Sequence, residues 1–391
     1  MQMRRRTGIR RRWAPLLCLA VSLAVIPYSA VGRADSATPA VGAVVALGDS
    51  FVSGEAGRWL GNARGGGASA HGTDRLCIRK WWGCQIRPGG VYRNGPTADC
   101  HRSDTAPVEI LARSFSRGVN LACSGAIARD IYLPPEHGPA SGLAPQADRL
   151  RAVAAHQRVS LVILAVGAND VGFSDLVADC TEAWFKSQRG GCRRAGAIAL
   201  ARRLPIFKER VEMAIASVTR AMQNAGYGRS SWEFIIHGYG SPIPPGRDYR
   251  YLESSVRRLL PGGCPFTDAD SDWANDDLVS TLNRNLKRLA LAHGARFLDL
   301  TGAFDGHRLC ETGSDLVSGS GPAEERAEWF RFLVPCCGGE KRESLHPNAY
   351  GQRSIASCLS VFLSHLNDIG TCTSRPGFGP SAVRVALSPA P

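Results

Sequence analysis

The stretch LVILAV (161–166) is apolar at every position and is followed directly by Gly167-Ala168-Asn169-Asp170. A strand that is apolar on both faces is typical of a parallel sheet covered by helices on both sides. The sequence predicts further strands at 41–47, 119–123, 232–237 and 295–300. Segments of helical period separate or follow them, at 105–115, 145–156, 197–224, 276–293 and 349–366. This alternation predicts a three-layer α/β/α sandwich around a mostly parallel sheet of about five strands.

Residues 1–34 differ in composition from the rest of the chain. Six arginines between Arg4 and Arg12 precede an apolar stretch at 13–26, and small residues follow up to Ala34. This order predicts an export signal peptide that is removed from the mature protein. The alternative is a membrane anchor, but the apolar stretch is too short to favour it. We therefore expect a secreted, extracellular protein.

The leader also accounts for much of the positive charge. The full chain has 47 Lys and Arg against 34 Asp and Glu, a net charge of +13. Seven of those arginines and no acidic residue lie in 1–34, so the remainder carries 40 bases against 34 acids, a net of +6. This excess favours transient contact with an anionic membrane or cell-wall surface. No run of Lys and Arg interleaved with aromatic residues stands out, so no nucleic-acid partner is predicted.

The cysteine count indicates disulfides. Of 13 cysteines, only Cys18 lies in the leader, and an even, high number in an exported chain is typical of a disulfide framework. The alternative is a zinc site that uses Cys336, Cys337 and His346, but the chain has no CxxC pair to support it. We expect neither a metal nor a cofactor.

One domain is expected at 35–372, without an interdomain linker or an internal repeat. Two stretches interrupt the α/β pattern and are interpreted as insertions, at 55–99 and 311–342. Because loops shape the pockets of such folds, these insertions are expected to set which ligand the pocket prefers. The tail at 373–391 is rich in Pro and Ser and is predicted to be disordered.

Polar groups suited to acyl transfer follow the predicted strands. The carboxyl ends of parallel strands meet at one edge of the sheet, where ligands bind. Ser50 follows the first strand, Gly125 the second and Asn169 the third, while His346 precedes the last helix. Each alone is equally typical of a turn or loop. The ordered set supplies a hydroxyl nucleophile, a close-approach backbone amide, a carboxamide donor and an imidazole base.

Four blocks occur in order along the chain: ALGDSFVSGE (46–55), NLACSGA (120–126), VGANDVGF (166–173) and SLHPNAYGQ (344–352). They resemble those of the SGNH (GDSL) hydrolase superfamily, specifically its secreted actinobacterial lipase/esterase branch, and the resemblance covers most of 41–366. It implies a flavodoxin-like SGNH fold, with Ser50 as nucleophile and His346 as its base. It also implies an oxyanion hole made of the backbone N–H groups of Ser50 and Gly125 and the amide of Asn169.

The third triad member departs from the family pattern. The family usually has Asp three residues before the histidine, and here that position holds Glu343. Three hypotheses stay open: Glu343 orients His346, the backbone carbonyl of Ser344 does so, as in some relatives, or neither does. Two other acids near this edge, Asp49 and Asp170, are expected to hold turns.

His237 ends the fourth predicted strand and is the only other histidine expected near the same sheet edge. For the cysteines, the resemblance implies the pairs Cys100–Cys123, Cys180–Cys192 and Cys264–Cys310. Cys77 and Cys84 can close a small loop, which leaves Cys336, Cys337, Cys358 and Cys372 to pair among themselves in an order that stays open.

The leading functional hypothesis is hydrolysis of carboxylic esters, with lipid or short acyl esters as substrates. The alternatives are deacetylation of a polysaccharide and, in another class, a non-catalytic surface-binding protein that keeps the fold. Trp59, Trp81 and Trp82 in the first insertion can stack on sugar rings, pack on acyl chains or bury the insertion.

Overall fold

The computed structural model describes residues 42–63, 73–93, 98–187, 191–317, 323–334 and 339–389. The predicted signal peptide lies outside these residues, as do Cys336 and Cys337. Within the described part of the chain, no helix is both long and apolar enough to cross a membrane.

A seven-stranded sheet forms the centre of the fold, with strand order β4-β1-β5-β6-β7-β8-β9. The strands are β1 (Ala43–Gly48), β4 (Gly118–Asn120), β5 (Val159–Ala165), β6 (Glu233–His237), β7 (Arg296–Gly302), β8 (Ile369–Thr373) and β9 (Arg384–Ser388). All neighbours pair in parallel except β8 and β9. The first five strands of this sheet along the chain, β1, β4, β5, β6 and β7, give the flavodoxin-like order 2-1-3-4-5, with β1 at the topological switch point where ligands bind. The predicted α/β fold is confirmed, with two more strands in the main sheet than expected.

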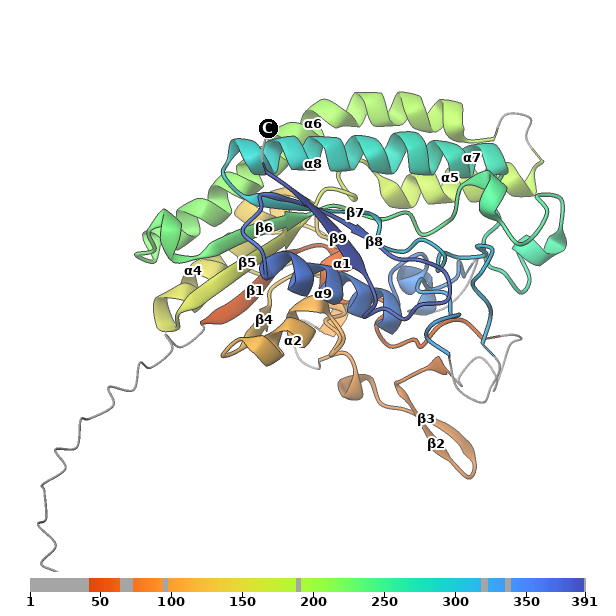
Figure 1. The fold of residues 1–391 in the computed structure, drawn as a ribbon, viewed down its shortest axis with the longest axis horizontal. Coiled ribbons are helices and arrows are strands. Elements are labelled where there is room, and N and C mark those ends of the chain that lie inside the picture. Colours follow the sequence, from red (N-terminus) through yellow and green to blue (C-terminus); the bar gives the residue numbers. More distant parts are fainter. Residues whose placement is uncertain are drawn as a thin grey trace, which may run out of the picture. The chain divides into compact units, whose positions relative to one another are not determined.

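Helices cover both faces of the sheet (Figure 1), with α6 and α8 on one side and α2 and α9 on the other. The helices are α1 (Ser50–Ser53), α2 (Pro107–Leu111), α3 (Arg129–Tyr132), α4 (Gln146–His156), α5 (Phe173–Phe185), α6 (Arg193–Asn224), α7 (Asp268–Trp273), α8 (Ser280–Ala292) and α9 (Ala349–Leu363). Helix α6 continues through Pro205, where the sequence permits a break. A π-helical turn at Ala274–Val279 joins α7 to α8.

The core lies between the sheet and these two helical layers. Every residue of β1 is buried, as the continuous apolar pattern predicts. Helix α6 packs Phe207, Val211 and Val218 against the core, and α9 packs Leu359 and Phe362. These residues recur at three-, four- and seven-residue intervals, so each helix presents one apolar stripe to the sheet.

The prediction of a disordered tail at 373–391 is wrong for the residues that the structure describes. Strand β9 pairs antiparallel with β8, from Thr373↔Arg384 to Ile369↔Ser388. Val385 and Leu387 alternate with exposed residues and pack against the core. This short period-2 pattern lies among Pro, Gly and Ser residues, whose composition suggested a solvated chain.

Five disulfides join described cysteines. Cys100–Cys123, Cys180–Cys192 and Cys264–Cys310 confirm the pairs implied by the resemblance, and Cys77–Cys84 closes the small loop. Cys358 of α9 pairs with Cys372 of β8, which resolves part of the pairing left open by the sequence. Cys77–Cys84 lies in a separate hairpin, formed by β2 (Cys77–Lys80) and β3 (Gly83–Ile86).

Candidate active site

Ser50 is the first residue of α1, directly beyond the carboxyl end of β1. Gly48 approaches the neighbouring strand so closely that a Cβ would lie 1.8 Å from the carbonyl oxygen of Ala165. Asp49 then caps α1, because its Oδ1 accepts a hydrogen bond from the N–H of Phe51 at 3.0 Å. The tight turn therefore fixes Ser50 at the sheet edge.

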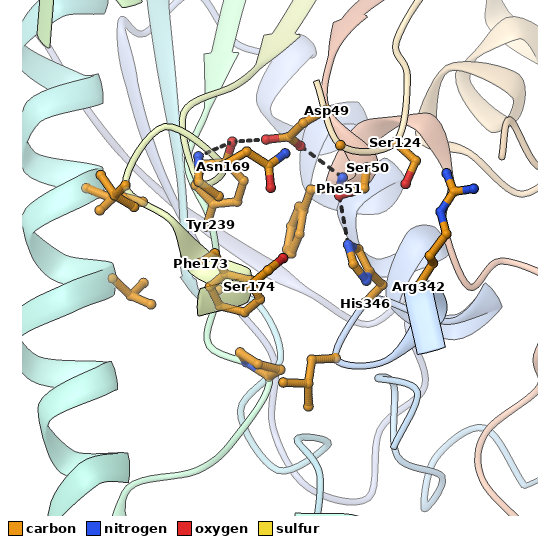
Figure 2. Close-up of a pocket in the computed structure, with 18 of the residues that line it drawn as sticks. Asp49, Ser50, Phe51, Ser124, Asn169, Phe173, Ser174, Tyr239, Arg342 and His346 are labelled. Atoms are coloured by element: carbon orange, nitrogen blue, oxygen red, sulfur yellow. Dashed lines mark hydrogen bonds between the residues drawn. The ribbon is translucent and has the colours of Figure 1, made fainter. Parts of the chain in front are cut away.

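His346 contacts Ser50 directly (Figure 2). Its Nε2 lies 2.7 Å from Ser50 Oγ, and its Nδ1 lies 2.9 Å from the carbonyl oxygen of Ser344. A carbonyl oxygen only accepts hydrogen bonds, so Nδ1 carries the hydrogen and Nε2 is the acceptor for the Ser50 hydroxyl. This is the tautomer that a general base requires.

The surroundings of His346 keep its imidazole neutral. Removal from water lowers its pKa, which the negative charge of Glu55 opposes, while electrostatic interaction with His101 and Arg342 lowers it further. The net result is a pKa below the usual value, so the base form predominates at neutral pH.

Gly125 and Asn169 line the same cavity as Ser50 and His346. Gly125 adopts φ of +80°, a left-handed conformation that favours glycine. Among the described residues, none accepts a hydrogen bond from the backbone N–H of Ser50 or Gly125. Asn169 Nδ2 donates to the carbonyl oxygen of Ala126 at 2.9 Å, which leaves the second hydrogen of its amide for another acceptor.

Asp49 and Asp170 hold the loops around the site. Asp49 Oδ2 accepts a hydrogen bond from Tyr239 at 2.6 Å, and Asp170 Oδ2 accepts one from the N–H of Ala128 at 2.8 Å. Burial raises the pKa of Asp49 to about 7, and that of Asp170 to about 6. These contacts agree with the expected turn-holding roles. Sequence reasoning did not single out Tyr239, although its place two residues after β6 puts it at the same sheet edge.

Glu343 is buried in a separate network of hydrogen bonds. Its Oε2 accepts from Trp59 Nε1 at 2.7 Å, its Oε1 accepts from the Tyr92 hydroxyl at 2.6 Å, and Arg58 Nε lies 3.8 Å away. Burial raises its pKa, against the opposing charge of Arg58. Among the three hypotheses for the partner of His346, the observed contact is the Ser344 carbonyl.

A group of potential metal ligands lies beside this network. Glu55, His101 and Glu343 each bring one ligand atom within 4.8 Å of the others. His101 Nδ1 already contacts Glu55 Oε1 at 2.6 Å, and Tyr92 stacks on the His101 ring at 4.6 Å. Burial opposes ionisation of Glu55, but interaction with His101 holds its pKa below the usual value. Hydrogen bonds within the protein therefore hold one oxygen of Glu55 and both oxygens of Glu343, whereas Glu55 Oε2 is buried without a hydrogen-bond partner among the described residues.

The cavity at the site measures about 200 Å³ and has one apolar wall. Phe173 of α5, Pro242 after β6, and Leu278 of the π-helical turn belong to this wall. The same three residues also line an adjoining apolar cavity of about 40 Å³, which reaches Ala274. The insertions were expected to shape the acyl pocket, but among the residues that line the first cavity only Arg342 comes from them. The wall is built instead by the start of α5, the loop after β6 and the π-helical turn before α8.

His237 does not line this cavity. The structure buries it completely, with Nδ1 2.9 Å from the carbonyl oxygen of Gly238, and burial lowers its pKa to about 4. It is thus a neutral core residue beneath the site.

The sequence profile of the GDSL-like Lipase/Acylhydrolase family matches residues 46–354, most of the chain. The chain belongs to this family. The four predicted site residues and Glu343 all lie within the matched region. The family description implies ester hydrolase activity. No curated protein sequence matches the chain significantly.

Two similar proteins of known structure have low sequence identity to the chain. A phospholipase A1 from Streptomyces albidoflavus is 22% identical, over 84% of this chain and 100% of that one, with a TM-score of 0.46. An extracellular lipase from Streptomyces rimosus is 19% identical, over 81% and 98% of the respective chains, with a TM-score of 0.43.

Proposed function

We propose that this protein is an exported serine hydrolase that cleaves carboxylic esters of apolar acyl groups, with Ser50 as nucleophile and His346 as general base. The observation that carries the proposal is the 2.7 Å contact between His346 Nε2 and Ser50 Oγ inside a cavity with an apolar wall. The five disulfides support export, because such bonds persist in oxidising compartments.

In the proposed reaction, Ser50 Oγ attacks the ester carbonyl carbon while its proton passes to His346 Nε2. The resulting imidazolium donates that proton to the departing alcohol, which leaves an acyl group on Ser50. Water, deprotonated by the same nitrogen, then releases the acid. The Ser344 carbonyl accepts the Nδ1 hydrogen throughout and so keeps Nε2 directed at Ser50.

Three donors would bind the oxyanion that forms during each attack. They are the backbone N–H groups of Ser50 and Gly125, which have no acceptor within the described chain, and the second amide hydrogen of Asn169. Helix α1 fixes the amide of Ser50, and the Cys100–Cys123 disulfide lies two residues from Gly125 and fixes its loop. The hydrogen bond to the Ala126 carbonyl orients the amide of Asn169. Fixed donors stabilise developing charge without reorganisation.

The apolar wall favours lipid-like acyl chains over the acetyl groups of polysaccharides. An acetyl group would contact little of the wall, whereas a longer chain would extend along Phe173 and Leu278 toward the adjoining cavity. Each buried methylene is worth about 0.8 kcal/mol, so the wall contributes to binding only for longer acyl groups.

Hydrolysis of p-nitrophenyl acetate, butyrate and decanoate by the mature protein tests this proposal. We expect turnover of all three, with kcat/KM rising from acetate to decanoate. Ser50→Ala should lose at least ~10⁴-fold in kcat, whereas Ser174→Ala, which removes another hydroxyl from the cavity lining, should retain most activity. Comparable activity in Ser50→Ala would refute the assignment of the nucleophile, and a preference for acetate would refute that of the acyl group.

A further inference from the structure

Hairpin β2–β3 carries exposed apolar side chains at its tip. Its two-residue turn consists of Trp81 and Trp82, which are 93% and 63% exposed. Ile78 and Ile86 on the strands are 40% and 46% exposed, but Ile86 pairs with Cys77 at the open end of the hairpin and lies on the opposite face from Ile78. Single exposed apolar residues are common, but two adjacent and largely exposed Trp side chains at one turn form a patch of the kind that marks an interaction surface.

Two exposed basic residues, Arg79 and Lys80, directly precede the turn, and a third, Arg87, follows β3 at the open end of the hairpin. Within the described residues none of the three forms an ion pair with a carboxylate. Exposed cations without a protein partner attract an anionic surface. The hairpin tip therefore combines large aromatic groups with unpaired positive charge.

Contacts at its base connect the hairpin to the segment that carries His346. The Cys77–Cys84 disulfide joins its strands, and Leu76 at its base packs with Val91 and Tyr92. Tyr92 in turn donates to Glu343, three residues before His346. Figure 1 shows the hairpin extending away from the central sheet. A partner bound at its tip would thus be held at a defined position relative to the site.

We propose that the β2–β3 tip docks the protein onto an anionic phospholipid surface, with Trp81 and Trp82 at the headgroup level and the neighbouring cations on lipid phosphates. Trp concentrates at membrane–water interfaces because its ring is apolar and its N–H is polar. Each Lys or Arg near an anionic leaflet strengthens binding by about fivefold.

The ring geometry favours lipid over a glycan as the partner. The rings of Trp81 and Trp82 lie 5.2 Å apart with an interplanar angle of 89°. Two perpendicular rings cannot form a flat platform for successive sugar rings, whereas both can enter the disordered headgroup layer. Docking would bring an acyl-ester hydrolase to its lipid substrates, and this benefit rests on the proposed function. Binding to the lipid surface itself requires no catalysis.

Vesicle binding by the mature Ser50→Ala protein tests the docking proposal separately from catalysis. Sedimentation with vesicles of phosphatidylglycerol and phosphatidylcholine, and with pure phosphatidylcholine, gives the partition coefficients. We expect stronger binding to the anionic vesicles, which high salt weakens, and a blue shift of Trp fluorescence. Replacing Trp81 and Trp82 by Ala should reduce partitioning by at least about tenfold, and Arg79→Gln with Lys80→Gln by about 25-fold.

Matched controls are Phe185→Ala, which removes a 51% exposed aromatic residue on α5, and Arg202→Gln, which removes an exposed cation on α6. Both should bind vesicles like the parent protein. When the same hairpin substitutions are made in the active protein, which keeps Ser50, hydrolysis of soluble p-nitrophenyl butyrate should be retained. This activity also shows that the variants fold. Unchanged partitioning of the Trp variant would overturn the proposal. Binding to insoluble cell-wall glycan without binding to vesicles would also overturn it.

Discussion

Replacing Glu343 by Ala separates a structural role from a catalytic one. The substitution removes the acceptor for Trp59 Nε1 and for the Tyr92 hydroxyl, both buried. A buried donor left without a partner costs about 1–3 kcal/mol, so the two together predict a loss of roughly 2–6 kcal/mol in the free energy of unfolding. Since about 2 °C of Tm corresponds to 1 kcal/mol in a large domain, we expect Tm to fall by roughly 4–12 °C.

The same substitution should change catalysis little. The Nδ1 hydrogen of His346 goes to the Ser344 carbonyl, which the substitution at 343 does not remove. We therefore expect kcat on p-nitrophenyl butyrate to stay within about threefold, measured at a temperature where the variant is folded.

Glu343→Gln is the matched control, because its amide oxygen still accepts one hydrogen bond while the charge is lost. It should lose less stability than Glu343→Ala and also keep its kcat. If Glu343 oriented His346 instead, both variants would lose kcat by about 10³-fold or more, as happens when the carboxylate of a triad is removed. That loss in a protein with unchanged Tm would refute the structural assignment.

Asn169→Ala should reduce kcat by about 10²–10³-fold with little change in Tm, measured by steady-state kinetics and thermal unfolding; an unchanged kcat would remove its amide from the oxyanion hole. Ala274→Phe should fill the adjoining cavity and reduce kcat/KM for decanoate at least ~10-fold but not for butyrate, while Ala201→Phe on an exposed position of α6 should do neither. Since protonated His346 cannot act as a base, kcat/KM should fall as pH decreases through its pKa, with a midpoint below the usual 6.5. Glu55→Gln removes the charge that raises this pKa and should move the midpoint lower still; a shift to higher pH would contradict the electrostatics.

The parts of the fold that the sequence predicts well are those where local pattern and burial agree. Strand β1 and residues 161–165 of β5 are apolar throughout because helices cover both faces, and these continuous apolar runs need no tertiary information to interpret. Asn348 likewise precedes α9 and caps it, accepting from the N–H groups of Tyr350 and Gly351.

Other features depend on contacts that sequence pattern does not encode. Strand β9 is short and becomes a strand because β8 offers it an edge, which composition alone does not reveal. The partners of Glu343 are 284 and 251 residues away along the chain, so nothing near position 343 distinguishes a triad acid from a buried structural one. The cavity wall posed the same difficulty, because α5 and the π-helical turn meet only in the folded protein.

The contact from His346 to the Ser344 carbonyl has a consequence for how this site can vary. Every amino acid has a backbone carbonyl, so no substitution at 344 deletes the acceptor, and no change of pH protonates it. Its position depends instead on the path of the chain, in which Leu345 adopts φ of +61°. Substitutions would therefore change the orientation of His346 through the backbone conformation at Leu345 more than through the side chain at Ser344. Glycine at 345 would adopt the same φ without strain, and so leave the imidazole directed at the same hydroxyl.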